Sequence, residues 1–201
     1  MSLNTLPQPH LQPPGAGLPA FELGWLRLYF RCVCTMTSHD AAMRKFALEA
    51  ERILSLARTV SAAQGTAPVL IGRITGIEDS SRYWSVFMVL DHLRIVNDGM
   101  AQIIAALSHD RHFTQEVRIQ DVKPYRASGP ETIDRYMKSV TNYTATIARL
   151  GRLSDRVRHA HPWFGPMTAH DWHCLAGIHH WVHRRQIERV KQGIGTTGIG
   201  S

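Results

Sequence analysis

Hydrophobic residues recur every three to four positions along four long stretches of this chain, the spacing of one face of an α-helix. The first stretch covers residues 40–60 and the second runs from about residue 80 to 108. The third covers 131–159, and the fourth runs from 168, where Thr168 is placed to cap a helix, to about 193. The apolar faces of these helices predict four buried aromatic side chains: Trp84, Tyr136, Tyr143 and Trp172.

The connection between the second and third helices, residues 109–130, is long and has only weak strand character. Long connections of this kind are often functional, or cross between distant ends of a bundle. No other part of the chain alternates convincingly as a sheet would. We therefore predict an all-α fold, a four-helix bundle with a long connection between helices two and three.

The pattern also divides the chain into three parts. Residues 1–36 are rich in proline near their start and predict an irregular N-terminal arm, residues 37–192 form the bundle, and residues 193–201 are a flexible glycine-rich tail. The most apolar part of the arm is interrupted by Glu22, Arg27 and Arg31, so it is a poor candidate for a membrane span. It also lacks the charge order of a signal peptide.

Composition narrows the function classes. The chain is 44% hydrophobic with a formal charge of +7, which permits an anionic partner, but no arginine stripe interleaves with aromatic residues. We therefore expect no nucleic-acid partner. The three cysteines, Cys32, Cys34 and Cys174, are too few and too unevenly spaced for a disulfide framework or a four-ligand zinc site. A reducing compartment, the cytoplasm, is the simpler interpretation, with Cys174 as a small buried hydrophobe.

Candidate chemistry is concentrated in the histidines. His179 and His183 lie one turn apart on the apolar face of the fourth helix, so both imidazoles can reach one ion. Twelve histidines in 201 residues produce roughly 0.7 such pairs by chance, so the pair alone is weak evidence. His92 adds to it, because it lies among apolar residues in the middle of the second helix. Three imidazoles on core faces need either separate hydrogen-bond partners or one shared metal ion.

Other polar residues near these histidines are weaker candidates for the site. Gln186 shares the face of His179 and His183, where it either orients a ligand and contacts substrate or is an ordinary polar residue at the bundle end. His180 is one position out of phase, and we expect it on the flank of the helix. His170 and His173 are expected on the surface of its first turns.

These residues resemble a known family. The chain is similar to the DinB-like (YfiT-like) metalloenzymes in two motifs: Trp84-x₇-His92-Leu93 in the second helix, and His179-x₃-His183-Arg184-x-Gln186-Ile187 in the fourth. The resemblance covers roughly residues 40–192. The segment HPWFGPMTAHDW that leads into the fourth helix resembles one branch of that superfamily. The resemblance implies a four-helix bundle with a divalent metal on His92, His179 and His183, and it makes a homodimer plausible.

Three protein ligands leave a metal open to substrate, which is the catalytic pattern. By resemblance, the expected activity is that of a metal-dependent enzyme with thiol-dependent S-transferase-like chemistry on a small-molecule substrate, with a low-molecular-weight thiol as cosubstrate. Arg184 or Arg185 is a candidate to hold a carboxylate of that thiol. The metal is a divalent transition ion such as Zn, Ni, Fe or Mn.

Two alternatives stay open. The same site can serve a hydrolase through activated water, or the chain can be a non-enzymatic binding protein with a structural metal. The ligand faces of the second and fourth helices offer no glutamate, and no H-E-x-x-H or E-x-x-H motif occurs. A zinc protease or a di-iron carboxylate site is therefore disfavoured.

Overall fold

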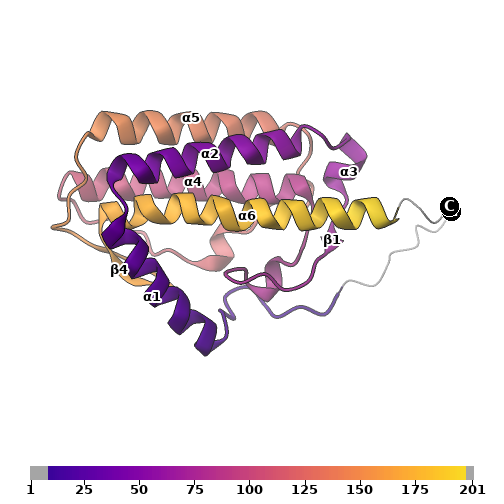
Figure 1. The fold of residues 1–201 in the computed structure, drawn as a ribbon, viewed down its shortest axis with the longest axis horizontal. Helices are drawn as coiled ribbons and strands as arrows, with labels where there is room; N and C mark the ends of the chain where they lie inside the picture. Colours follow the sequence, from indigo (N-terminus) through magenta and orange to yellow (C-terminus); the bar gives the residue numbers. More distant parts are fainter. Residues whose placement is uncertain (1–8, 198–201) are drawn as a thin grey trace.

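The computed structural model describes residues 9–197. Within them, four long helices run side by side as a bundle and a further long helix crosses their end at an angle (Figure 1). The bundle helices are α2 (His39–Ala57), α4 (Val86–Ser108), α5 (Thr132–Leu150) and α6 (Ala169–Thr197); the crossing helix is α1 (Ala20–Met36), and α3 (Ala62–Thr66) is a short turn. The predicted four-helix bundle is confirmed.

Side-chain caps fix where three of the bundle helices begin. The Ser38 hydroxyl accepts from the Ala41 amide at the start of α2, and the Ser85 hydroxyl accepts from the Met88 amide at the start of α4, both at 3.2 Å. At α6 the Thr168 hydroxyl accepts from the Asp171 amide at 3.1 Å, while the Asp171 carboxylate accepts from the Thr168 amide at 2.9 Å. The cap predicted at Thr168 is therefore present.

Short irregular elements connect the helices. A two-stranded antiparallel pair joins β1 (Val69–Leu70) to β2 (Tyr83–Trp84), with the 3₁₀ turn η1 (Asp79–Ser81) just before β2. Hence α4 begins at Val86, later than its hydrophobic pattern predicted. The long connection after α4 contains the 3₁₀ turn η2 (Ile119–Val122).

A second hairpin replaces the end of the predicted third helix. That helix, α5, stops at Leu150, because Gly151 adopts a φ of 63°. The antiparallel pair of β3 (His159–His161) and β4 (Gly165–Met167) follows and leads into α6. The prediction that helix continues to residue 159 was wrong, since proline and glycine in this segment favour a hairpin.

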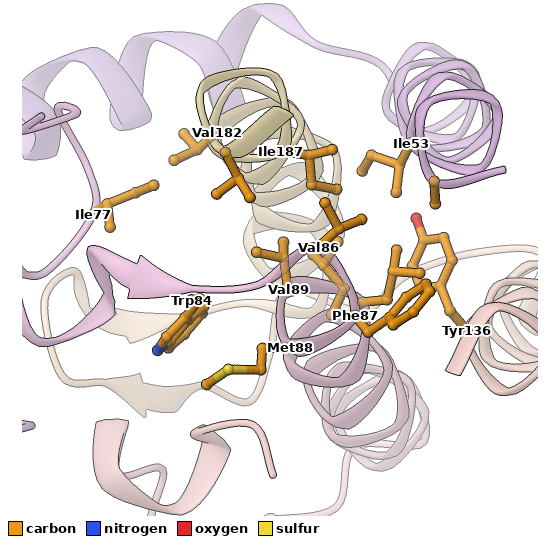
Figure 2. Packing of buried hydrophobic residues seen from close by; sticks show 14 of the residues in the cluster. Ile53, Ile77, Trp84, Val86, Phe87, Met88, Val89, Tyr136, Val182 and Ile187 are labelled. Carbon is orange, nitrogen blue, oxygen red and sulfur yellow. The ribbon is translucent and has the colours of Figure 1, made fainter. Parts of the chain in front are cut away.

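Helix α6 packs against both α2 and α4. Figure 2 shows the contact from close by, with Ile53 of α2, Phe87 of α4, Tyr136 of α5 and Ile187 of α6 directed into one apolar cluster. A second cluster surrounds Trp172 toward the start of α6. The four aromatic residues predicted for the core are all buried, with relative exposures of 0–4%: Trp84, Tyr136, Tyr143 and Trp172.

The two ends of the chain differ from their predictions. Residues 20–36 form helix α1 rather than an irregular arm, and α6 continues past Gly193 to Thr197 rather than ending there. Residues 9–19 are irregular, with a turn at residues 14–15, and they bind the start of η1: the amides of Gly15 and Gly17 donate to the Glu78 carboxylate at 3.1 and 2.9 Å. The rest of the predicted arm and tail, residues 1–8 and 198–201, lies outside the described residues.

Across residues 9–197, none of the helices combines the length and the apolar composition that a bilayer crossing requires.

Candidate metal centre

Three imidazoles meet between α4 and α6. His92 comes from α4, His179 and His183 come from successive turns of α6, and one ring nitrogen of each lies within 4.8 Å of those of the other two. The Nε2 atoms of His92 and His179 are 3.1 Å apart. The structure thus brings together all three residues that the sequence indicated as ligands.

Two of the rings are oriented by acceptors on their outer side. The Nδ1 atom of His92 is 2.6 Å from the carbonyl oxygen of Val122, and Nδ1 of His183 is 2.7 Å from Oε1 of Gln186. Carbonyl oxygens only accept, so both Nδ1 atoms carry the proton and both Nε2 atoms are left with a lone pair. This outer hydrogen bonding is typical of metal-binding histidines.

Gln186 itself is held in place. Its Nε2 donates to the carbonyl oxygen of Ser81 at 2.7 Å, which turns Oε1 toward His183, and its side chain is fully buried. Gln186 therefore contacts a candidate ligand from behind. The alternative of an ordinary polar residue at the bundle end does not describe this position.

Burial keeps these imidazoles neutral near pH 7. Desolvation lowers the pKa of His92 to about 4, and it is also the largest cause of the lowered pKa values of His179 and His183. Neutral imidazole is the form that binds metals. The Nδ1 atom of His179 is buried and has no hydrogen-bond partner, so no hydrogen bond on the outer side orients this ring.

The geometry fits one transition-metal ion. Two nitrogens bound about 2.0–2.1 Å from a tetrahedral ion lie about 3.3 Å apart, close to the 3.1 Å between His92 and His179. A donor set of three imidazoles suits zinc, nickel, iron and related ions. The cluster can therefore hold a metal.

A cavity of about 410 Å³ opens onto the cluster. All three histidines line it, and most of its wall is apolar. The apolar lining includes Val96, Met100, Ile103, Val117, Phe164 and Ile178. Any metal held by the triad would thus face a hydrophobic pocket of the size that accepts small molecules.

Three polar residues of this cavity were not identified from the sequence: Lys123, Glu78 and His161. Lys123 follows η2 and donates to the Glu78 carboxylate at 3.0 Å and to the hydroxyls of Ser80 and Ser81 at 2.7 and 3.0 Å. Burial raises the pKa of Glu78, but hydrogen bonds from Ser80, Gly17 and Lys123 outweigh it and leave the pKa lowered. Both residues lie in irregular segments, where periodicity carries no information.

His161 is the third. It ends β3 and lines the cavity, and its Nδ1 accepts from the Trp163 amide at 3.1 Å. Since Nδ1 is the acceptor, the neutral ring carries its proton on Nε2. Desolvation lowers the pKa of His161 to about 3, so it stays neutral. The only sequence signal was its position in the HPWFGP segment.

The structure corrects the expectations for two other histidines. His180 is fully buried rather than on the helix flank, and its Nδ1 donates to the carbonyl oxygen of Ala176 at 2.8 Å. His173 is also fully buried rather than exposed: Nδ1 accepts from the Tyr143 hydroxyl at 2.8 Å, and Nε2 donates to the carbonyl oxygen of His39 at 3.3 Å. Neither belongs to the triad.

The arginines of α6 lie elsewhere. Arg184 pairs with Glu49 at 2.6 Å and with Glu188, and Arg185 lies over the ring of Trp181. Neither lines the cavity, whereas Arg94, Arg118 and Lys123 do. The expectation that Arg184 or Arg185 holds a substrate carboxylate therefore has no geometric support.

The fold and this cluster together define a helical bundle with a histidine triad between α4 and α6. A family model described as the DinB superfamily matches residues 45–187, more than two thirds of the chain. The chain belongs to the DinB superfamily, and the resemblance seen around His92 and His179 is confirmed.

Other comparisons add less. The crystal structure of TT2238, described as a four-helix bundle protein, is 18% identical, with a TM-score of 0.49, over 75% of this chain and 98% of that one. Among curated proteins, none matches the chain.

Proposed function

We propose that this protein is a metal-dependent enzyme in which His92, His179 and His183 hold one divalent transition metal beneath an apolar pocket. The observation that carries the proposal is the convergence of three neutral imidazoles, two buried and one half-buried, in which outer hydrogen bonds turn two lone pairs inward. Membership of the DinB superfamily supports the same assignment. A bound divalent ion would supply a Lewis acid that lowers the pKa of a thiol or water ligand.

The proposed activity is thiol-dependent S-transferase-like chemistry on a small, largely apolar electrophile, with a low-molecular-weight thiol as cosubstrate. The resemblance to the family suggested a thiol, and the polar residues of the pocket support it over water. Glu78 is the buried carboxylate there, and four donors hold it: Gly15, Gly17, Ser80 and Lys123. Because of these hydrogen bonds, Glu78 is not free to act as a general base. A thiol, with an ordinary pKa of about 8.5, depends less than water on a general base to lose its proton.

Two polar residues of the pocket, His161 and Arg118, would bind the substrate and the thiol. The Nε2–H of His161 donates a hydrogen bond to the substrate or to its leaving group, because Nδ1 is already an acceptor. Arg118, an exposed residue of the rim that pairs with Glu116 at 2.9 Å, would exchange that partner for the carboxylate of the thiol. The apolar wall excludes water from the reacting atoms.

The first experiment is elemental analysis of the untagged protein after dialysis without strong chelator. About one equivalent of a single transition metal per chain is expected. Less than about a tenth of an equivalent, with no uptake of zinc, nickel or manganese, would overturn the proposal. A metal-loaded protein is then screened for transfer of low-molecular-weight thiols to aryl halides and epoxides, with ester and amide hydrolysis as the comparison. Metal binding without either activity would indicate a binding protein with a structural metal.

We also propose that the protein works in the cytoplasm as a homodimer. Free thiols at Cys32, Cys34 and Cys174 support a reducing compartment. Helix α1 exposes an apolar side on which Phe21, Trp25 and Leu28 are 82%, 62% and 58% exposed, and such a surface favours self-association. Sedimentation of the wild type against Trp25→Glu tests this: a monomeric wild type would contradict it.

A further inference from the structure

Two cysteines from distant parts of the chain meet one imidazole, away from the histidine triad. Cys34 lies in the last turn of α1 and Cys174 near the start of α6; both are buried, with relative exposures of 8% and 3%. The Nε2 atom of His170 is 3.4 Å from the sulfur of Cys174 and 3.1 Å from the carbonyl oxygen of Cys34. Both cysteines belong to the same buried cluster, and each thiol shifts the pKa of the other.

The direction of these hydrogen bonds makes Cys174 the more acidic thiol. The carbonyl oxygen of Cys34 can only accept, so Nε2 of His170 carries a proton, which it also presents to the Cys174 sulfur. The interactions with Cys34 and with the His170 ring lower the pKa of Cys174, against the effect of burial, while its interaction with Cys174 raises the pKa of Cys34. Hydrogen bonding to Cys174 raises the pKa of His170 to about 9. Such a thiolate beside a cationic imidazole is a reactive nucleophile.

We propose that Cys34 and Cys174 form a reversible disulfide on exposure to a hydroperoxide, with Cys174 as the oxidised thiol and Cys34 as the resolving thiol. The sulfur of Cys174 attacks the peroxide, the O–O bond breaks, and an alcohol or water leaves with a proton, so that Cys174 becomes a sulfenic acid. The sulfur of Cys34 then attacks that of Cys174, the S–O bond breaks, and water leaves with the thiol proton. One hydroperoxide is reduced by two electrons, and a dithiol reverses the bond.

Access to the pair depends on α1. Of the α1 side chains, only Phe30 and Cys34 are buried, so this helix is held to the bundle by few apolar contacts. Helices held in this way open locally at low free-energy cost, which admits a small oxidant.

The disulfide would also restrain one wall of the cavity beside the histidine triad. Leu26 of α1 lines the cavity, Phe30 stacks on Phe164 of the β3–β4 hairpin with ring centroids 4.5 Å apart, and Arg27 donates to the carbonyl oxygen of Trp163 at 2.6 Å. A link from Cys34 to α6 pins this helix against the hairpin. Oxidation therefore holds α1 over one wall of the cavity.

The test uses the reduced, full-length wild-type protein with about one equivalent of hydrogen peroxide at pH 7, followed by alkylation in denaturant and peptide mapping. We expect two of the three thiols to be lost, the mass to fall by about 2 Da, and a Cys34–Cys174 peptide, with Cys32 still alkylated. Amide exchange in α1 should slow after oxidation, and Tm should rise by roughly 5–15 °C because the bond closes a long loop.

Variants separate this bond from other oxidation. Cys32→Ser should form the same bridge, Cys174→Ser should keep both remaining thiols, and His170→Gln should slow oxidation at pH 7 by about tenfold. A bridge between Cys32 and Cys34, a bridge between two chains through Cys32, or over-oxidation of Cys174 without a bridge would overturn the proposal. The wild-type peptide map decides the matter even if a variant fails to fold.

Discussion

Helix α6 carries two kinds of core-facing histidine, which differ in whether their rings converge. His179 and His183 share one space with His92, and the rings are 4.4–5.1 Å apart by their centroids. His173 and His180 are buried more completely, but each has its own carbonyl partner, on His39 and Ala176. A pKa lowered by desolvation is common to both kinds. The convergence of their ring nitrogens on one space distinguishes the candidate metal centre from histidines that are each satisfied within the core.

The largest expected effect comes from removing one converging ring. His183→Ala deletes a candidate ligand and leaves two, so metal affinity should fall by more than about 100-fold, beyond the 10–100-fold typical of residues that only orient a ligand. The helical fold should persist, as measured by circular dichroism. Elemental analysis after dialysis is the readout, and full metal occupancy in this variant would remove His183 from the site.

A smaller loss is expected from the residue behind that ring. Gln186→Leu removes the acceptor for His183 Nδ1, so the tautomer that directs Nε2 inward is no longer fixed. Metal affinity should fall by about 10–100-fold in competition with a chelator. Gln186→Glu is the comparison variant, because it retains an acceptor for His183 while it replaces the donor to Ser81 by a carboxylate oxygen and adds a negative charge. Equal losses in both variants would indicate a packing defect instead.

The matched histidine on the other side of α6 should leave metal binding almost unchanged. His180→Ala is expected to alter affinity by less than about tenfold. It should lower the free energy of unfolding of the apoprotein by about 1–3 kcal/mol, since it removes a buried ring and the donor to Ala176. Urea unfolding and metal titration of the same sample separate the two effects. A larger loss of affinity would place His180 in the site.

The smallest effect concerns pH. His173 is neutral in the fold because burial lowers its pKa to about 4, whereas the unfolded residue titrates near 6.5. Its contribution to stability is therefore present above pH 6.5 and is lost as pH falls toward 4, with a slope of about 1.4 kcal/mol per pH unit between them. His173→Gln should reduce that slope in the apoprotein and leave metal affinity unchanged. Identical slopes in wild type and variant would show that His173 does not titrate in this range.

Much of the bundle was predictable because helical periodicity and caps are local. The apolar spacing around Phe46 and Tyr143 identified α2 and α5, and Thr168 identified the start of α6. Segments without periodicity were not predictable. The β3–β4 hairpin and the helical part of the N-terminal arm were missed, the latter because α1 keeps most of its apolar side chains exposed.

For the candidate site, the sequence by itself determined that His179 and His183 lie one turn apart on the same side of a helix, and that His92 lies among apolar residues of another. Only the tertiary structure decided that α4 and α6 pack in a register where the three rings meet. It also decided that Val122 contacts His92, and that Lys123 and His161 line the same cavity from two connections. It also decided the burial of His173 and His180, because α6 is covered by α2 as well as α4. A helical wheel assumes one buried face, whereas a helix inside a bundle has neighbours on several sides.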